Sequence, residues 1–121
     1  MLHLEIEEVL PRRIETGTTD GDILGFTEDL FSGWLEIYQD SRLYLYYIIS
    51  RCKNEGNTQK LLRRWIGEGY DVRIVKPSHI MQHILGAFGY VKSFENLSRH
   101  YDHEVEVWRR QDVPAIPRPG E

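Results

Sequence analysis

The sequence predicts an α+β or α/β domain: a mixed central β-sheet with helices on both faces. Segments that alternate apolar and polar side chains, as strands do, are interspersed with segments whose apolar residues recur every three to four positions, as in helices. A strand at 43–49 is followed by such a helix and then by a strand at 71–75, so these two strands are expected to run parallel with a right-handed crossover. The length of 121 residues fits one domain, expected over 1–112, followed by a proline-rich tail at 113–121.

Each element is assigned from periodicity and from its start and stop signals. The expected order is an edge strand at 2–9, a helix at 23–31, strands at 34–38 and 42–49 joined by a hairpin turn, a helix at 59–66, a strand at 71–75, a helix at 80–88 and a last strand at 104–108. The expected helix caps are Asp20 or Asp22, Asn57 or Thr58, and Ser78. The strand at 43–49 is nearly all apolar, so it is expected to be central and covered on both sides.

Charge is distributed unevenly along the chain. Residues 1–41 contain ten acidic and two basic side chains, whereas residues 42–76 contain eight basic and three acidic ones. The basic block coincides with the strand, loop and helix that begin at Leu43, so a phosphate-bearing ligand is expected there. A solvated helix face opposite an acidic neighbour would give the same pattern.

The loop before the helix at 59–66 is a candidate anion site. The first N–H groups of a helix have no partner within it, and the positive end of the helix dipole lies beside them. Arg51 and Lys53 precede the helix, and Gly56 permits a tight turn. The alternative interpretation is that Gly56 only turns the chain into a helix.

The histidine pairs, the single cysteine and the other basic residues are further candidates for a site. The pairs His79/His83 and His100/His103 have spacings that could bind zinc, but the glutamate of a zinc-protease helix is missing, and no metal is expected. Cys52 is the only cysteine, so an internal disulfide is excluded and a small apolar filler is expected. Nucleic acid is not the expected partner, because the acidic segment would repel phosphates. The basic residues that could contact it are Arg63, Arg64, Arg73 and Lys76.

An ordered series of segments carries a family resemblance. The series is Lys53-Asn-Glu-Gly56-Asn-Thr58, Leu61-Leu62, Val72–Val75, Gly89-Tyr90 and Val105–Trp108. Over residues 43–108 the chain resembles the carboxyl-terminal two-thirds of a GNAT-type (Gcn5-related) N-acetyltransferase. That family places a strand, a pyrophosphate loop of pattern Arg/Gln-x-x-Gly-x-Gly/Ala, a helix, a strand, a helix ending in Gly-Phe or Gly-Tyr, and a final strand in succession. In the loop, Lys53 stands for Arg/Gln and Thr58 for the second small residue.

The resemblance implies a binding site for acetyl-CoA, or another acyl-CoA, as co-substrate. Backbone amides after the strand would hold the pyrophosphate, basic side chains would supply charge, and the strand end would pair with the pantetheine arm. The residues implied are Ile49, Ser50, Arg51, Lys53, Gly56, Asn57, Thr58, Gln59 and Lys60.

Two residues are candidates for catalysis. Family members commonly carry a tyrosine that acts as the acid four residues before the glycine of Gly-Phe. Here that position is Leu85, and the nearby substitutes are Tyr90 and His83, of which Tyr90 is the candidate acid. The family often places a glutamate base on the strand before the loop, whereas here the nearest carboxylate is Glu36, on the neighbouring strand.

Two functions are therefore expected as alternatives. The first is an acyl-CoA-dependent N-acyltransferase that moves an acetyl group to an unidentified amine in a ternary complex. The second is a catalytically inactive GNAT-like structural or interaction protein, such as a phage virion or accessory protein, with a second copy or a virion component as partner. No apolar run approaches the roughly 20 residues of a membrane span, and the amino terminus lacks a basic leader, so a cytoplasmic location is expected, or the virion if phage-encoded.

Overall fold

The computed structural model describes residues 10–52 and 55–111. The strand expected at 2–9, the tail at 113–121 and Lys53 lie outside the described residues. Among the described residues, no helix is both long enough and apolar enough to cross a membrane.

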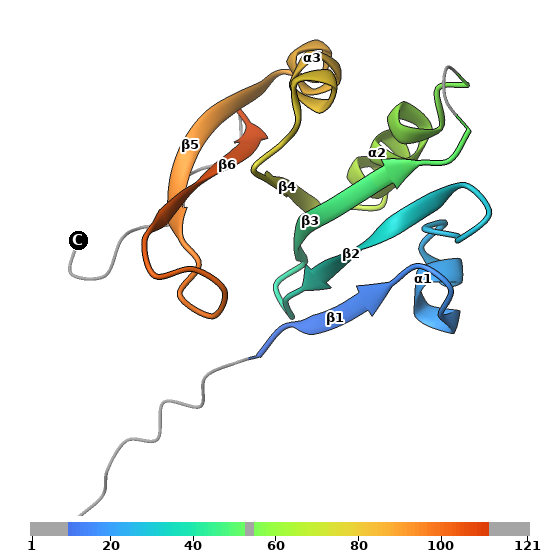
Figure 1. Ribbon diagram of the computed structural model, residues 1–121, viewed down its shortest axis with the longest axis horizontal. Helices are drawn as coiled ribbons and strands as arrows, with labels where there is room; N and C mark the ends of the chain where they lie inside the picture. Colours follow the sequence, from blue (N-terminus) through green and yellow to red (C-terminus); the bar gives the residue numbers. More distant parts are fainter. Residues whose placement is uncertain (1–9, 53–54, 112–121) are drawn as a thin grey trace, which may run out of the picture.

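Within residues 10–52 and 55–111, a six-stranded mixed sheet forms the centre of the fold (Figure 1). Its strands are β1 (Arg12–Glu15), β2 (Phe31–Ile37), β3 (Arg42–Ser50), β4 (Asp71–Val75), β5 (Tyr90–Asn96) and β6 (Glu104–Arg110). They are arranged in the order β1-β2-β3-β4-β6-β5, and β3 and β4 are parallel while all other neighbours are antiparallel. The predicted parallel pair and the hairpin between the second and third strands are confirmed.

In the part of the chain that the structure describes, three helices connect the strands: α1 (Thr19–Ile23), α2 (Asn57–Gly67) and α3 (His79–Ala87). The predicted cap of α3 is confirmed, because the Ser78 side chain accepts a hydrogen bond from the Met81 amide. The cap predicted for α2 is wrong: the capping position is Gly56, in a left-handed conformation. The helix predicted at 23–31 is also wrong in its bounds, since α1 is shorter, earlier and capped by Thr18.

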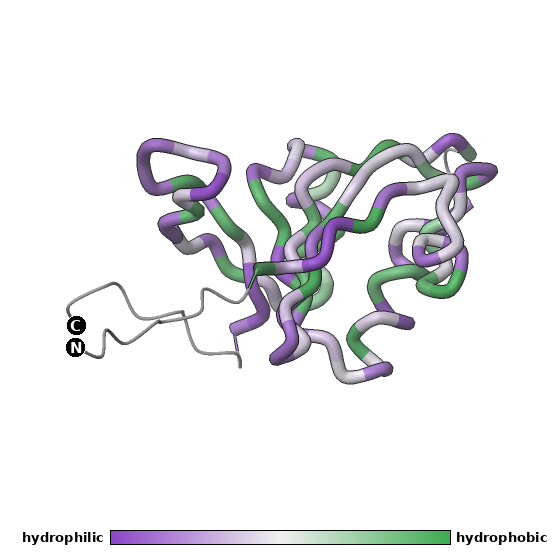
Figure 2. The backbone as a smooth tube through the Cα atoms, turned by 90° about the horizontal axis from the view of Figure 1, so that it is seen from below, coloured by the Kyte–Doolittle hydropathy of each residue, from purple (hydrophilic) through white to green (hydrophobic). Residues whose placement is uncertain are grey.

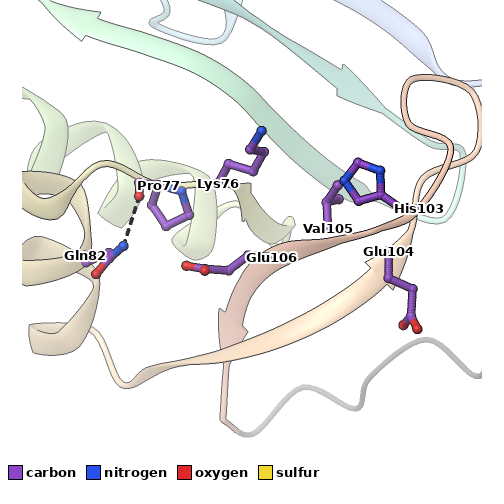
Figure 3. Close-up of a pocket in the computed structure, with 7 residues that line it drawn as sticks. All are labelled: Lys76, Pro77, Gln82, His103, Glu104, Val105 and Glu106. Atoms are coloured by element: carbon purple, nitrogen blue, oxygen red, sulfur yellow. Dashed lines mark hydrogen bonds between the residues drawn. The ribbon is translucent and has the colours of Figure 1, made fainter.

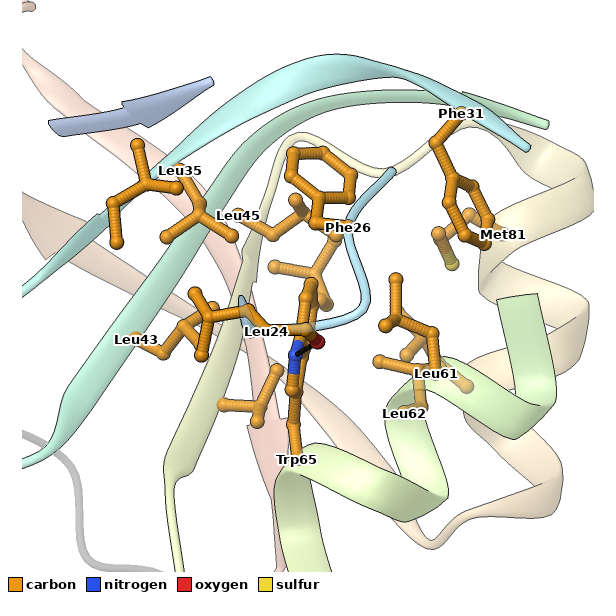
Figure 4. Close-up of a cluster of buried hydrophobic side chains, with 14 of the residues drawn as sticks. Leu24, Phe26, Phe31, Leu35, Leu43, Leu45, Leu61, Leu62, Trp65 and Met81 are labelled. Atoms are coloured by element: carbon orange, nitrogen blue, oxygen red, sulfur yellow. Dashed lines mark hydrogen bonds between the residues drawn. The ribbon is translucent and has the colours of Figure 1, made fainter. Parts of the chain in front are cut away.

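The main core lies on one face of the sheet, where strands and helices pack together (Figure 4). Its fully buried residues include Leu35, Leu43 and Leu45 from the sheet and Leu62, Trp65 and Leu85 from α2 and α3. The Trp65 indole donates a hydrogen bond of 2.9 Å to the carbonyl of Leu24, just after α1. Hydrophilic residues gather at the turns that join the elements (Figure 2).

The opposite face is covered by the β5–β6 hairpin. A second cluster of Tyr44, Val75, Leu97, Val105 and Val107 lies there, and the described helices contribute no residue to it. The prediction of helices on both faces is therefore corrected: helices cover one face, and a strand hairpin with its connecting turn covers the other. The strand β5 was not predicted, and β6 was predicted shorter than it is.

Candidate functional site

The two parallel strands at the centre of the sheet separate after a short paired stretch. Arg42 to Leu45 of β3 pair with Asp71 to Ile74 of β4. β4 ends at Val75, where it pairs with β6, whereas β3 continues to Ser50. Beyond Leu45, no described strand pairs with the edge of β3 that faces β4. This edge therefore offers backbone donors and acceptors to a ligand.

A bulge bends β3 at the point of separation. Trp34 pairs with Tyr47 and Leu35 with Leu45, so Tyr46 is an extra residue without an opposite partner. Bulges bend a strand and redirect its side chains. Gly33 allows the close approach of β2 here, because a Cβ at this position would lie 1.9 Å from the carbonyl oxygen of Tyr47.

The amino terminus of α2 follows β3, as predicted. Gly56 has a φ of +70° and, as a glycine, has no side chain that could cap the helix, so the first-turn amides have no side-chain cap among the described residues. A Cβ added to Gly56 would meet no atom of the described residues within 4 Å. A side chain at this position would therefore point into open space among the described residues.

The predicted cofactor residues around this turn differ in their exposure to solvent. Ile49 is 47% exposed and Lys60 is also exposed, whereas Thr58 is buried. The Ser50 hydroxyl donates to the carbonyl of Cys52, and the Arg51 guanidinium donates to the carbonyl of Phe31. Arg51 is therefore directed back towards β2. The remaining described members, Asn57 and Gln59, are half-buried.

Glu36 lies on the face covered by the hairpin, in a polar cluster that the sequence did not predict. Its side chain is 3% exposed. Arg99 Nη1 lies 3.0 Å from both carboxylate oxygens, and His100 Nε2 lies 3.1 Å from Oε2. Arg99 and His100 belong to the turn between β5 and β6, so this turn is tied to β2 across the sheet.

Aromatic rings hold this polar cluster against the bulge of β3. Trp34 and Tyr46 are stacked with ring centroids 4.5 Å apart, and the His100 ring stands edge-on at 4.8 Å from Tyr46 and 5.5 Å from Trp34. Burial and, secondly, the charge of Glu36 raise the pKa of Tyr46 above its ordinary value, so its hydroxyl stays protonated at neutral pH. The cluster thus lies where β3 and β4 begin to separate.

A second buried network anchors the hairpin nearby. The Tyr44 hydroxyl donates to Glu95 Oε1 over 2.6 Å, and Arg73 Nη1 donates to Glu95 Oε2 over 3.0 Å. Arg73 also donates to Asp71 Oδ2. Glu95 of β5 is therefore bonded to both β3 and β4, although β5 is not their neighbour in the sheet.

Tyr90, the candidate acid, lies in the main core. It is 5% exposed, and its hydroxyl donates to the carbonyl of Val72 over 2.9 Å. Leu85, at the position of the family tyrosine, is fully buried in the same core. Their surroundings are those of packing residues.

An open hollow of about 350 Å³ lies at the carboxyl end of β4 (Figure 3). It is lined by Lys76, Pro77, Gln82, His103, Glu104, Val105 and Glu106. None of the candidate catalytic or cofactor residues lines this hollow. Lys76 reaches out of it to the ring of Tyr101, with Nζ 5.4 Å from the centroid.

No protein-family model, curated protein or solved structure matches this chain. Sequence reasoning found Glu36 and the turn before α2 but gave Arg99 no role and considered His100 only as a metal ligand. An acidic residue within an apolar strand does indicate that a cationic or donor partner is needed, because a buried carboxylate requires one, but it does not say which residues supply it.

Proposed function

We propose that this chain is an acyl-CoA-dependent N-acyltransferase of GNAT type, which moves an acetyl group from acetyl-CoA directly to an amine in a ternary complex. One observation carries the proposal: the parallel strands β3 and β4 separate beside a partly exposed cluster of ionisable side chains, built around the buried carboxylate of Glu36. A thioester placed between the separating strands would have its carbonyl next to the bulge at Tyr46 and the Glu36 cluster.

The geometry supports an extended ligand that ends at α2. The unpaired edge of β3 beyond Leu45 is suited to the amides of a pantetheine arm, which would add to the sheet as a strand does. The uncapped amides after Gly56 follow β3 in the chain and are suited to a pyrophosphate. Lys60, which is exposed in the first turn of α2, can add a positive charge.

A direct test is the thermal stability of the full chain with acetyl-CoA. For a dissociation constant one hundredth of the ligand concentration, binding adds about 2.7 kcal/mol to the free energy of unfolding, a rise of several degrees in Tm. Absence of any rise at millimolar acetyl-CoA would end the enzyme interpretation.

A matched pair of variants locates the ligand. Gly56→Asp places a carboxylate before the helix amides, and Gly69→Asp places one at a glycine of similar positive φ, +94°, beyond the other end of α2. Aspartate tolerates this conformation better than most residues, so both variants should fold. Gly56→Asp should abolish the acetyl-CoA shift, and Gly69→Asp should retain it; loss in both, or in neither, would place the ligand elsewhere.

The second candidate is a GNAT-like structural or interaction protein without chemistry. It is favoured by the engagement of both Glu36 oxygens and by the position of Tyr90 and Leu85 in the core. It predicts no acetyl-CoA shift, and association through exposed apolar residues such as Tyr47 and Phe94. Sedimentation of the full chain and of a chain lacking residues 113–121 would test association; a monomer in both cases would count against a second copy as partner.

A further inference from the structure

His100 is placed as a base would need to be. Its side chain is 25% exposed, whereas that of Glu36 is 3% exposed. Its Nε2 is bonded to Glu36, while Nδ1 has no hydrogen-bond partner among the described residues. When Nε2 carries the proton and donates it to Glu36, Nδ1 has a free lone pair.

Glu36 itself is poorly placed to take a proton from a substrate. Both of its oxygens are in contact with Arg99, and one also contacts His100. A carboxylate in this position can instead fix the tautomer and the orientation of the imidazole, as the acidic member of a catalytic triad does. We infer that His100 is the general base of the proposed N-acyl transfer and that Glu36 is a positioning residue. This inference rests on the proposed function.

The surroundings of His100 restrict its movement. The ring stands edge-on to Tyr46 and Trp34, whose own rings are stacked. The backbone amides of His100 and Tyr101 both donate to the carbonyl of Leu97, which closes the turn. A base held in this way does not have to be ordered when substrate binds.

The other described histidines lack this arrangement. His79 and His83 on α3 make no hydrogen bond or ion pair with a carboxylate among the described residues. The His103 side chain is 69% exposed, and its partner, Asp102, is 98% exposed. Only His100, of the described histidines, combines a buried carboxylate partner with packing against the bulge of β3.

The proton balance of the reaction requires only one such group. As the neutral amine nitrogen attacks the thioester carbonyl, an N–C bond forms and the amine proton passes to His100 Nδ1. The C–S bond then breaks, and the CoA thiolate leaves with the electron pair of that bond. The imidazolium returns its proton to the thiolate, which yields the amide, CoA thiol and neutral His100. The reaction therefore needs no separate acid, neither a tyrosine at the position of Leu85 nor Tyr90.

The test is ¹⁵N NMR of the imidazole nitrogens in the full chain, with signals assigned from single His→Gln variants. The expected result is a His100 ring protonated at Nε2 and unprotonated at Nδ1. Acetyl-CoA should shift the His100 Nδ1 signal together with the backbone amides of Asn57 and Thr58, and leave His79 and His83 unchanged. In Glu36→Gln the tautomers should become mixed, whereas in Arg99→Gln, which leaves the carboxylate in place, the Nε2–H form should persist.

The outcomes separate this inference from the proposed function. A His100 ring protonated at Nδ1, or one that does not respond while the α2 amides shift, overturns the role of His100 and leaves cofactor binding intact. An unchanged tautomer in Glu36→Gln overturns the positioning role of Glu36. If acetyl-CoA shifts neither the α2 amides nor the ring, the proposed function fails, and the inference fails with it.

Discussion

Replacing Tyr44 by phenylalanine is expected to destabilise the fold at neutral pH. The Tyr44 side chain is buried, and its hydroxyl donates to Glu95 Oε1 over 2.6 Å. A hydrogen bond to a charged group contributes about 1.5–3 kcal/mol, so Y44F should lose about 2 kcal/mol of unfolding free energy at pH 7. For a domain of this size the loss corresponds to a fall in Tm of roughly 6–10 °C.

The same variant should lose less stability at alkaline pH. Burial raises the pKa of Tyr44 above its ordinary value of 10.0 and is the largest cause. The hydrogen bond with Glu95 and the negative charge of Glu95 raise this pKa further. Above pH 10 the unfolded chain releases the phenol proton while the folded chain keeps it, so wild-type stability falls by about 1.4 kcal/mol per pH unit. Phenylalanine has no such proton. The difference of about 2 kcal/mol should therefore close near pH 11.5.

Urea unfolding followed by circular dichroism at several pH values between 7 and 11.5 measures both effects. Tyr38 and Tyr46 are present in both chains, so their contributions cancel in the comparison. Tyr47→Phe is the matched control on the same strand: its residue is 49% exposed, and the change should be under about 0.5 kcal/mol at pH 7. A difference between wild type and Y44F that stays constant above pH 10 would refute the reasoning.

Two further predictions concern packing. Gly33→Ala would place a Cβ 1.9 Å from the backbone oxygen of Tyr47, which cannot move without parting β2 from β3, so we expect a loss of more than about 3 kcal/mol in thermal unfolding. Gly69→Ala, where a Cβ meets no described atom within 4 Å, should lose only about 1 kcal/mol through its left-handed backbone; equal losses would contradict the steric explanation. Trp65→Phe removes the indole donor to the Leu24 carbonyl and leaves a gap in the core. Urea unfolding should show a loss of about 2–4 kcal/mol in the free energy of unfolding. Unchanged stability of this variant would show that the carbonyl finds another donor.

The strands and helices with clear local signals could be predicted from sequence. The strand Asp71–Val75 was predicted to the residue, because alternation precedes a proline that ends it. The helix α3 was predicted from its serine cap and its apolar stripe. These signals lie within about ten residues of each other and need no tertiary information.

Other elements were missed because tertiary contacts override the local pattern. Leu24, Phe26 and Phe31 resemble one face of a helix, but Gly25 adopts a φ of +78° and the phenylalanines enter the core from an irregular segment and from a strand. β5 was missed because its buried residue near the end is Glu95, and an acidic residue at an inward position hides the alternation of a strand. Its burial is explained by Arg73 and Tyr44, which lie on other strands.

The candidate site was predicted only where it is local. The turn at Gly56 was found because strand, glycine and helix are contiguous in sequence. Glu36 and His100 are 64 positions apart, and no pattern in either segment indicates the contact. The residue at which β3 separates from β4 also has no local signal in the sequence, since it depends on where β6 takes over the pairing of β4.

The two ionic networks on the hairpin face together hold the proposed base in position. Burying charges is costly, and ion pairs in a core often add little net stability, so apolar contacts alone could have held β5 and β6 over the sheet. Ion pairs and hydrogen bonds are directional, however, and here they fix the hairpin at two points. Glu95 fixes the end of β5 next to the turn against β3 and β4, and Glu36 fixes the turn itself against β2. The imidazole of His100 is thereby held beside the bulge at Tyr46, a position that non-directional packing would define less sharply.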